Sequence, residues 1–116
     1  MKVFTEEEFK KVNIFLGLSI KYARLKKGIS QLDLAVGIGS TNASIGRIER
    51  AEHFSKWNNV VEVMQFLSLS FDELLIVKDK KSILKLVDEC YRLDNKLTGK
   101  KENYYVELRQ RINDLF

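Results

Sequence analysis

The stretch from Ser30 to Glu52, SQLDLAVGIGSTNASIGRIERAE, constrains the fold more than any other part of this chain. A small residue, Ala35, stands four positions before Gly39, and apolar residues recur on both sides of this pair. That spacing predicts two short helices that cross at a tight turn near Gly39, with the second helix held away from the body. The apolar positions that would join the two helices are Leu34, Ile38, Ile45 and Ile48.

The second of these helices, expected from Thr41 to Arg50, carries polar and basic residues on the face that packing does not use. Such a pair is typical of a helix-turn-helix that reads DNA, in which the first turn of the second helix meets base edges. An asparagine amide can pair with adenine, an alanine methyl can contact thymine, and an arginine can pair with guanine. We therefore predict base contacts by Thr41, Asn42, Ala43, Ser44, Gly46 and Arg47.

The sequence before this motif predicts one long helix. Thr5 followed by Glu8 is a capping-box pattern, and Gly28 suits the end of a helix. We expect the helix to extend to Lys27, with Gly17 as a candidate break that divides it into two pieces. Its predicted buried face consists of Phe9, Val12, Leu16, Ile20 and Ala23.

The sequence after the motif predicts two more helices in the same body. One extends from about Lys56 to Leu67, and a short one follows Ser70, which forms a capping-box pattern with Glu73. The residues expected to be buried on the longer of the two are Trp57, Val60, Val61, Met64 and Leu67.

Beyond Val77 the pattern changes to a charged segment, KDKKS, followed by two apolar stripes at helical spacing. These stripes predict a helical hairpin that turns near Thr98 and Gly99. Two helices alone cannot bury both stripes, so the hairpin needs either the N-terminal body or a second copy of itself. We predict dimerisation through the stripe residues Ile83, Leu86, Cys90, Leu93, Leu97, Tyr105, Leu108, Ile112 and Leu115.

The segment from Leu18 to Leu75 resembles the DNA-binding domain of the lambdoid repressor and Cro class, also called the xenobiotic-response-element family. That family has an isoleucine and an arginine on its first helix, then SQ-x-x-LA-x-x-x-G, and then an isoleucine, an arginine and IE-R-G. This chain matches the run without a gap, except that Ala51 replaces the final glycine. The matching residues are Ile20, Arg24, Ser30, Gln31, Leu34, Ala35, Gly39, Ile45, Arg47, Ile48, Glu49 and Arg50.

The resemblance implies an all-α fold, with a five-helix repressor-like helix-turn-helix domain over residues 1–77 and the helical hairpin over residues 78–116. It also implies a salt bridge between Arg24 and Glu49 and a phosphate contact by Gln31 at the start of a helix. We add Arg50, Lys56 and Asn58 as candidate phosphate contacts, because they follow the helix that would enter the groove.

Composition limits the other classes of function. The chain has 116 residues and a net charge of +4, which is too small to establish nucleic-acid binding by itself. A single cysteine excludes an internal disulfide, and no run of apolar residues is long enough for a membrane span. We find no nucleophile with a base, no phosphate-binding glycine loop and no metal-ligand set. We therefore expect no enzyme, no cofactor and no metal, and a cytoplasmic location.

These observations predict a sequence-specific transcription regulator that binds double-stranded DNA. One helix-turn-helix buries too little surface for tight binding, so we expect a homodimeric repressor on a palindromic operator. The alternative is an antitoxin or a partner-controlled regulator, in which the hairpin binds another protein.

Overall fold

A computed structural model describes residues 5–76, 78–94 and 98–116, and within these ranges every regular element is a helix. The predicted all-α fold, a helix-turn-helix body followed by C-terminal helices, is therefore confirmed. No helix of the described chain is long and apolar enough to cross a membrane. The helices are α1 (Glu6–Lys26), α2 (Gln31–Ile38), α3 (Asn42–Arg50), α4 (Trp57–Phe66), α5 (Phe71–Leu74), α6 (Lys80–Leu93) and α7 (Gly99–Leu115).

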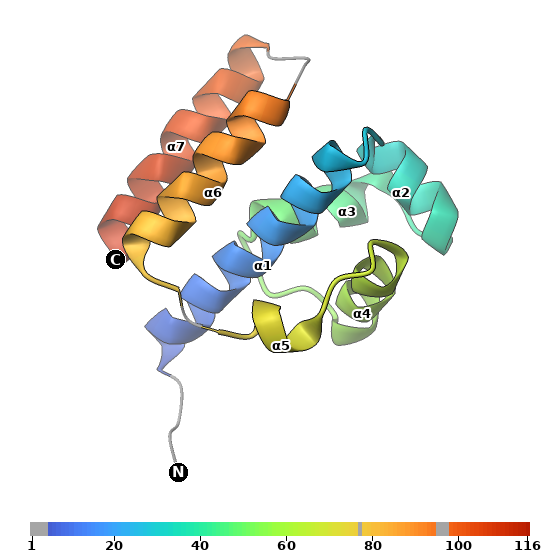
Figure 1. Cartoon of the computed structure of the whole chain (residues 1–116), viewed down its shortest axis with the longest axis horizontal. Coiled ribbons are helices and arrows are strands. Elements are labelled where there is room, and N and C mark those ends of the chain that lie inside the picture. The colour runs from blue at the N-terminus through green and yellow to red at the C-terminus, as the bar shows by residue number, and fades with distance from the viewer. Residues whose placement is uncertain (1–4, 77, 95–97) are drawn as a thin grey trace.

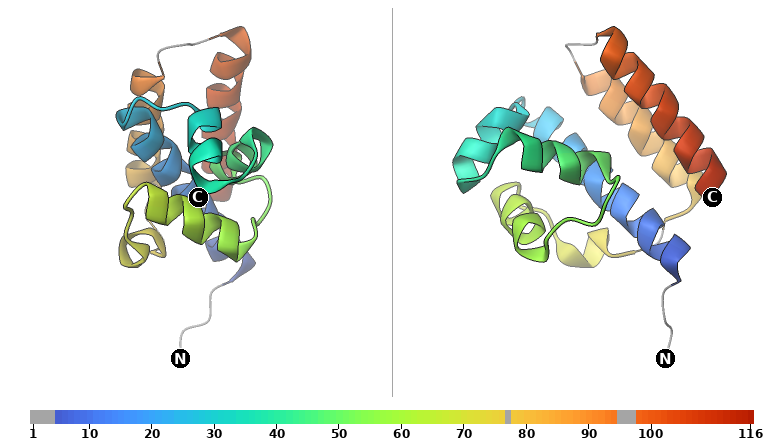
Figure 2. Two further views of the ribbon diagram at one scale, coloured as in Figure 1. Left: turned by 90° about the vertical axis from the view of Figure 1, so that its right-hand side faces the viewer. Right: turned by 180° about the vertical axis from the view of Figure 1, so that it is seen from behind.

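Helix α1 lies between the two parts of the molecule (Figure 1). Helices α2 to α5 pack on one side of it, and the antiparallel pair α6 and α7 packs on the other, as the view from behind also shows (Figure 2). Because both sides of α1 are covered, its apolar residues do not follow the single stripe that the sequence predicts. Ile14 and Leu18, which we do not predict as buried, are each 1% exposed.

The first hydrophobic core joins α1 to the helix-turn-helix and to α4 and α5. Leu16 and Ile20 of α1 meet Leu34 of α2 and Ile45 of α3, and all four side chains are buried. Helix α4 closes this core from the far side. Its contribution comes from Val60, Val63, Met64 and Leu67.

The second core joins α1 to the C-terminal hairpin. Ile14 and Leu18 of α1 pack against the stripes of α6 and α7, so the N-terminal body covers the stripes and no second copy is needed for this purpose. The dimerisation predicted for these residues rested on the need to bury the stripes. That need is met within the chain, and most of these residues are not accessible to another chain. Ile83, Cys90, Tyr105, Leu108 and Ile112 are buried, Leu86, Leu93 and Leu115 are partly buried, and Leu97 lies outside the described residues.

The predicted helix starts differ in outcome. Thr5 and Glu8 form both hydrogen bonds of a capping box at the start of α1, so that prediction is confirmed. Ser70 and Glu73 do not form a capping box, because Ser70 makes no side-chain hydrogen bond at the start of α5. Helix α5 is a single turn that packing holds in place, with Leu74 buried beneath it.

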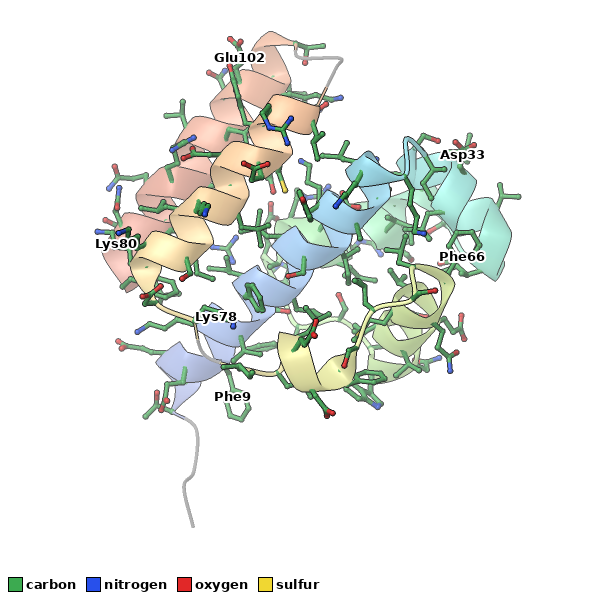
Figure 3. All side chains as sticks on the ribbon, viewed as in Figure 1. Phe9, Asp33, Phe66, Lys78, Lys80 and Glu102 are labelled. Atoms are coloured by element: carbon green, nitrogen blue, oxygen red, sulfur yellow. The ribbon has the colours of Figure 1, made fainter. Side chains whose placement is uncertain are left out.

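Two aromatic residues predicted to be buried are exposed instead. Phe9 is 50% exposed and Trp57 is 58% exposed. Phe9 lies on the first turns of α1, and Figure 3 shows it at the outer edge of the molecule. Trp57 begins α4 and lies beyond the end of the first core, with its ring 5.3 Å from that of Phe71. Helical spacing predicts the face of a helix, but it does not show how far along that face the core extends.

Gly17 does not divide α1, which is continuous through this position. The glycine has a different role, because the end of α3 crosses α1 here. A Cβ atom at Gly17 would lie 2.6 Å from the carbonyl oxygen of Ile48 and 2.8 Å from that of Glu49. The missing side chain therefore lets the backbone of α3 approach α1 closely.

Replacing Gly17 with alanine is expected to lower the free energy of unfolding by about 1–3 kcal/mol, because the new methyl group would meet backbone atoms that cannot rotate away. Urea denaturation measures the change. The control is Gly99→Ala at the first position of α7, where a Cβ atom would meet nothing within 4 Å. We expect that variant to be neutral or slightly more stable. Equal midpoints for the two variants would refute the close-approach explanation.

Candidate nucleic-acid interface

The helix-turn-helix is formed by α2, the turn at Gly39 and α3. Ser30 caps α2, and Gly39 ends it in the left-handed region with φ +66°. Thr41 then caps α3 by accepting a hydrogen bond from the backbone N–H of Ser44 at 3.1 Å. The bounds predicted for the second helix, Thr41 to Arg50, therefore hold to within one residue.

Helix α3 has one buried face and one exposed face. Ile45 and Ile48 are at most 4% exposed and hold the helix against α1 and α2. The opposite face leaves Asn42, Ala43 and Arg47 exposed to solvent. Because Ala43 and Arg47 are four positions apart, they lie one above the other on the same face. An amide, a methyl and a guanidinium group are thus presented together, away from the core.

The other predicted base-contacting residues have partners within the chain. The hydroxyl of Thr41 donates to that of Ser44 at 3.1 Å, so this pair also stabilises the start of α3. Gly46 is buried, and a Cβ atom there would lie 2.8 Å from Nη1 of Arg50. The Arg50 side chain extends over Gly46 in this structure, so a base contact at Gly46 remains a prediction that requires the Arg50 side chain to move.

The predicted ion pair between Arg24 and Glu49 is present and buried. The guanidinium of Arg24 donates from Nε to one carboxylate oxygen at 2.7 Å and from Nη2 to the other at 3.1 Å. Their side chains are 8% and 1% exposed. A third donor, Nη1, reaches the carbonyl oxygen of Ile29 at 2.9 Å. Arg24 therefore fixes α3 and the loop before α2 to the end of α1.

Gln31 belongs to the same network. Its amide nitrogen donates to Glu49 at 3.0 Å, and its side chain is only partly exposed. The sequence predicts a phosphate contact for this residue, whereas its position shows a bond that ties the start of α2 to α3. One amide hydrogen of Gln31 remains for another partner.

The predicted phosphate contacts Arg50, Lys56 and Asn58 are all exposed. Arg50 ends α3 and pairs with Glu52 at 3.4 Å, in an ion pair that solvent screens. Lys56 precedes the first residue of α4, and Asn58 lies in its first turn. These three side chains are free of the core and carry two positive charges close to α3.

The structure reveals a support for α3 that the sequence analysis misses. From α7, the guanidinium of Arg111 donates to the carbonyl oxygens of Arg50, at 2.8 Å, and of Ala51. From α1, the amide of Asn13 donates to the carbonyl oxygen of His53 at 3.2 Å. Carbonyl groups at the end of a helix have no partner in the helix and attract cations. The C-terminal hairpin thus holds the end of the helix expected to read DNA.

Ala51 gives the one sequence signal for this support. It replaces a glycine of the family pattern, and it adopts φ 51°, which is strained for a residue with a side chain. Its methyl group is 4% exposed and packs in the second core beside the hairpin. The departure from the pattern therefore marks the place where α6 and α7 meet the end of α3.

Two side chains that could be reactive, Cys90 and His53, differ in their surroundings. Burial raises the pKa of the Cys90 thiol to about 12, which keeps it protonated and unreactive at neutral pH. His53 is exposed. Among the described residues, no three His, Cys, Asp or Glu side chains are grouped closely enough to hold a metal ion.

Replacing Arg24 with methionine is expected to lower the free energy of unfolding by about 3–5 kcal/mol, because the Glu49 carboxylate would stay buried without its cation. Urea denaturation measures the loss. In the double variant with Glu49→Met, much of the stability should return, because no unpaired charge remains. The control is Arg92→Met, which breaks an exposed pair with Glu89 and should cost under about 1 kcal/mol. Equal losses in Arg24→Met and Arg92→Met would contradict a structural role for the buried pair.

One comparison with known proteins bears on this geometry. The family described as Helix-turn-helix matches residues 20–56, from the C-terminal half of α1 to the residue before α4. No curated protein and no solved structure matches the chain. The matched residues contain α2, α3 and the Arg24–Glu49 pair. Over residues 20–56 the chain is therefore similar to the Helix-turn-helix family, and this similarity supports a DNA-binding role for this part of the chain.

Proposed function

We propose that this protein is a sequence-specific transcription regulator that places α3 in the major groove of double-stranded DNA. The observation that carries the proposal is the division of α3 into two faces. Ile45 and Ile48 are buried in the first core, while Asn42, Ala43 and Arg47 are exposed on the other side. A helix held in this way can enter the groove without disturbing the core.

The exposed groups match the chemistry of base edges. The Asn42 amide can pair with adenine, and the Ala43 methyl can contact the methyl group of thymine. Arg47 can form two hydrogen bonds with guanine. Arg50, Lys56 and Asn58 would then contact phosphates and fix the register, which carries no sequence information by itself.

We further propose that two copies act together on a palindromic operator, with half-sites about 34 Å apart or a multiple of that distance. The argument is one of affinity, because one domain of this size buries little DNA surface. The pairing surface would lie outside the apolar stripes of α6 and α7, since these stripes pack on α1. Repression by occlusion of a promoter is the simplest outcome of such binding.

The antitoxin or partner-controlled alternative required hairpin stripes that are free to bind another protein. Most of those side chains are buried within the chain, so we favour a regulator that acts through DNA.

Replacing Arg47 with alanine is expected to weaken binding by about 1–3 kcal/mol and to relax the preference at one base pair, if Arg47 reads guanine. Selection from random duplex DNA would first identify the preferred site. Fluorescence anisotropy at several salt concentrations would then measure affinity for this site and for variants of each base pair. If Arg47 contacts a phosphate, the loss is uniform and the salt slope falls by about one.

Arg109→Ala is the matched control, because Arg109 pairs with Asp88 on the C-terminal hairpin and should not affect base preference. An Arg47→Ala variant that folds and binds every sequence as the wild type does would remove Arg47 from the interface.

The stoichiometry on DNA tests the pairing. We expect two copies per duplex when the selected site is palindromic, measured by sedimentation velocity with a labelled duplex. A duplex that carries one half-site should bind one copy and bind it much more weakly. Saturation of the full site by a single copy, at the same affinity as the half-site, would refute pairing.

A further inference from the structure

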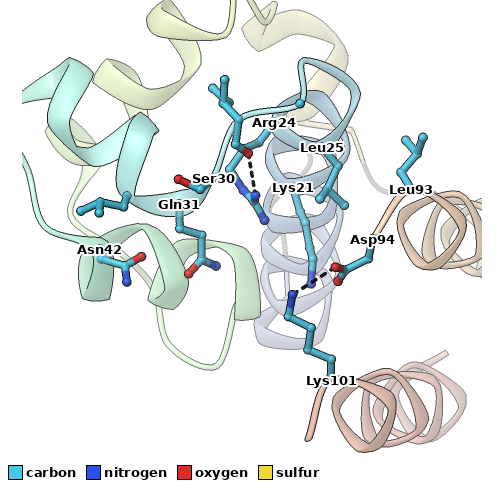
Figure 4. Close-up of a pocket in the computed structure, with 12 residues that line it drawn as sticks. Lys21, Arg24, Leu25, Ser30, Gln31, Asn42, Leu93, Asp94 and Lys101 are labelled. Atoms are coloured by element: carbon cyan, nitrogen blue, oxygen red, sulfur yellow. Dashed lines mark hydrogen bonds and ion pairs between the residues drawn. The ribbon is translucent and has the colours of Figure 1, made fainter. Parts of the chain in front are cut away.

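A pocket with both charged and apolar lining residues lies between the helix-turn-helix and the C-terminal hairpin (Figure 4). Its volume is about 450 Å³, and its walls come from the end of α1, the starts of α2 and α3, the end of α6 and the first turn of α7. Gln31 and Asn42 line one wall, while Asp94 and Lys101 line the other, and Lys21 extends between them. We call this space the Lys21 pocket.

The charges around the Lys21 pocket do not balance. Glu49 is paired with Arg24 through two hydrogen bonds and also accepts one from Gln31. Asp94 accepts a hydrogen bond from Lys101 at 3.1 Å. Each carboxylate therefore has its own cation, and Lys21 is the cation that remains.

The ammonium group of Lys21 is an unused donor in a mostly buried position. The residue is 8% exposed, so more than nine-tenths of it is out of solvent. Its nitrogen lies 4.4 Å from the ring centre of Tyr104 and 4.6 Å from that of Tyr105. Its nitrogen is not fully enclosed, and among the described residues it makes no hydrogen bond or ion pair, so the described chain supplies no acceptor to its three N–H groups.

Burial of an ammonium group without an acceptor is costly, and burial accordingly lowers the pKa of Lys21. The carboxylate of Asp94 makes no hydrogen bond with Lys21 and is engaged with other donors. One of its oxygens accepts from Lys101 and the other accepts from the hydroxyl of Tyr105 at 3.1 Å. An anion from outside the chain would complete the set of acceptors.

We propose that the Lys21 pocket binds a phosphate group, with Lys21 as its main charge and Lys101 as a second donor. Phosphate fits because its several oxygens can accept hydrogen bonds from opposite walls of the pocket at once. The amides of Gln31 and Asn42 are further side-chain donors in the lining, as is the hydroxyl of Ser30. The volume exceeds that of the group itself, so a larger molecule can carry it.

The phosphate has two sources with the same chemistry. One is the backbone of a duplex bound at α3, because Gln31 and Asn42 begin the two helices of the motif. The other is a free phosphate compound that binds beside the motif. The first source rests on the proposed function, while the second does not.

Titration of the protein with inorganic phosphate tests the site directly. Amide chemical shifts would be followed by NMR, at an ionic strength kept constant with sodium chloride. We expect saturable shifts for residues that line the pocket and at least tenfold weaker binding by Lys21→Met. That variant should fold, because a methionine side chain packs well on tyrosine rings. If it does not fold, Lys101→Met takes its place, because it removes a donor and frees Asp94 to neutralise Lys21.

The control is Lys85→Met, which removes an exposed lysine of α6 and should leave the phosphate affinity unchanged. The proposal fails if phosphate gives no saturable shifts beyond those of chloride. It also fails if Lys21→Met, or Lys101→Met in its place, binds phosphate as tightly as the wild type. This experiment contains no DNA, so its result does not depend on the proposed function.

A second measurement separates the two sources. If the pocket takes a phosphate of the duplex, the selected DNA site abolishes the phosphate-induced shifts, and Lys21→Met lowers the salt slope of DNA binding by about one. If the pocket takes a free phosphate compound, the protein–DNA complex still binds inorganic phosphate, and Lys21→Met binds DNA at the wild-type salt slope. Each of these results supports the site and assigns its ligand.

Discussion

The buried pair of Arg24 and Glu49 is the interaction on which the rest of the structure depends. It joins α1 to α3. It also fixes the start of α2, because Arg24 donates to the carbonyl oxygen of Ile29 and Glu49 accepts from the amide of Gln31. A buried ion pair adds little stability compared with apolar residues, but breaking it is costly because a charge is left unpaired. Its effect is therefore mainly on geometry, since alternative arrangements of the three helices would leave one charge without its partner.

Helix α3 is held at its C-terminal end by two sets of contacts. The pair with Arg24 and the bond from Gln31 act through Glu49, while Arg111 and Asn13 hold the carbonyl groups that follow the helix. The contacts of Arg111 and Asn13 come from α7 and α1, so the hairpin is part of the support of α3. A change in the hairpin would therefore affect the position of α3, although most of the hairpin packs on the other side of α1 (Figure 2).

Local signals in the sequence predict much of the fold and part of the candidate site. The caps at Thr5, Ser30 and Thr41 and the turn at Gly39 act within a few residues of themselves, so their effects are visible in the pattern. The burial of Gly46 and the engagement of Gln31 are not, because both depend on side chains brought in from other turns and helices. The pairing of Arg24 with Glu49 is foreseen only through the resemblance to a known family.

The sequence by itself determined where α1, α2 and α3 begin and which face of α3 is polar, because caps and helical spacing are properties of neighbouring residues. Only the tertiary structure decided what covers the stripes of α6 and α7, since two apolar stripes can be buried by α1 or by another copy. It also decided that Gly17 is a crossing point, that Ala51 packs under the hairpin, and that Lys21 is left without an acceptor. Each of these facts depends on residues that are far apart in the chain and meet only when the helices pack.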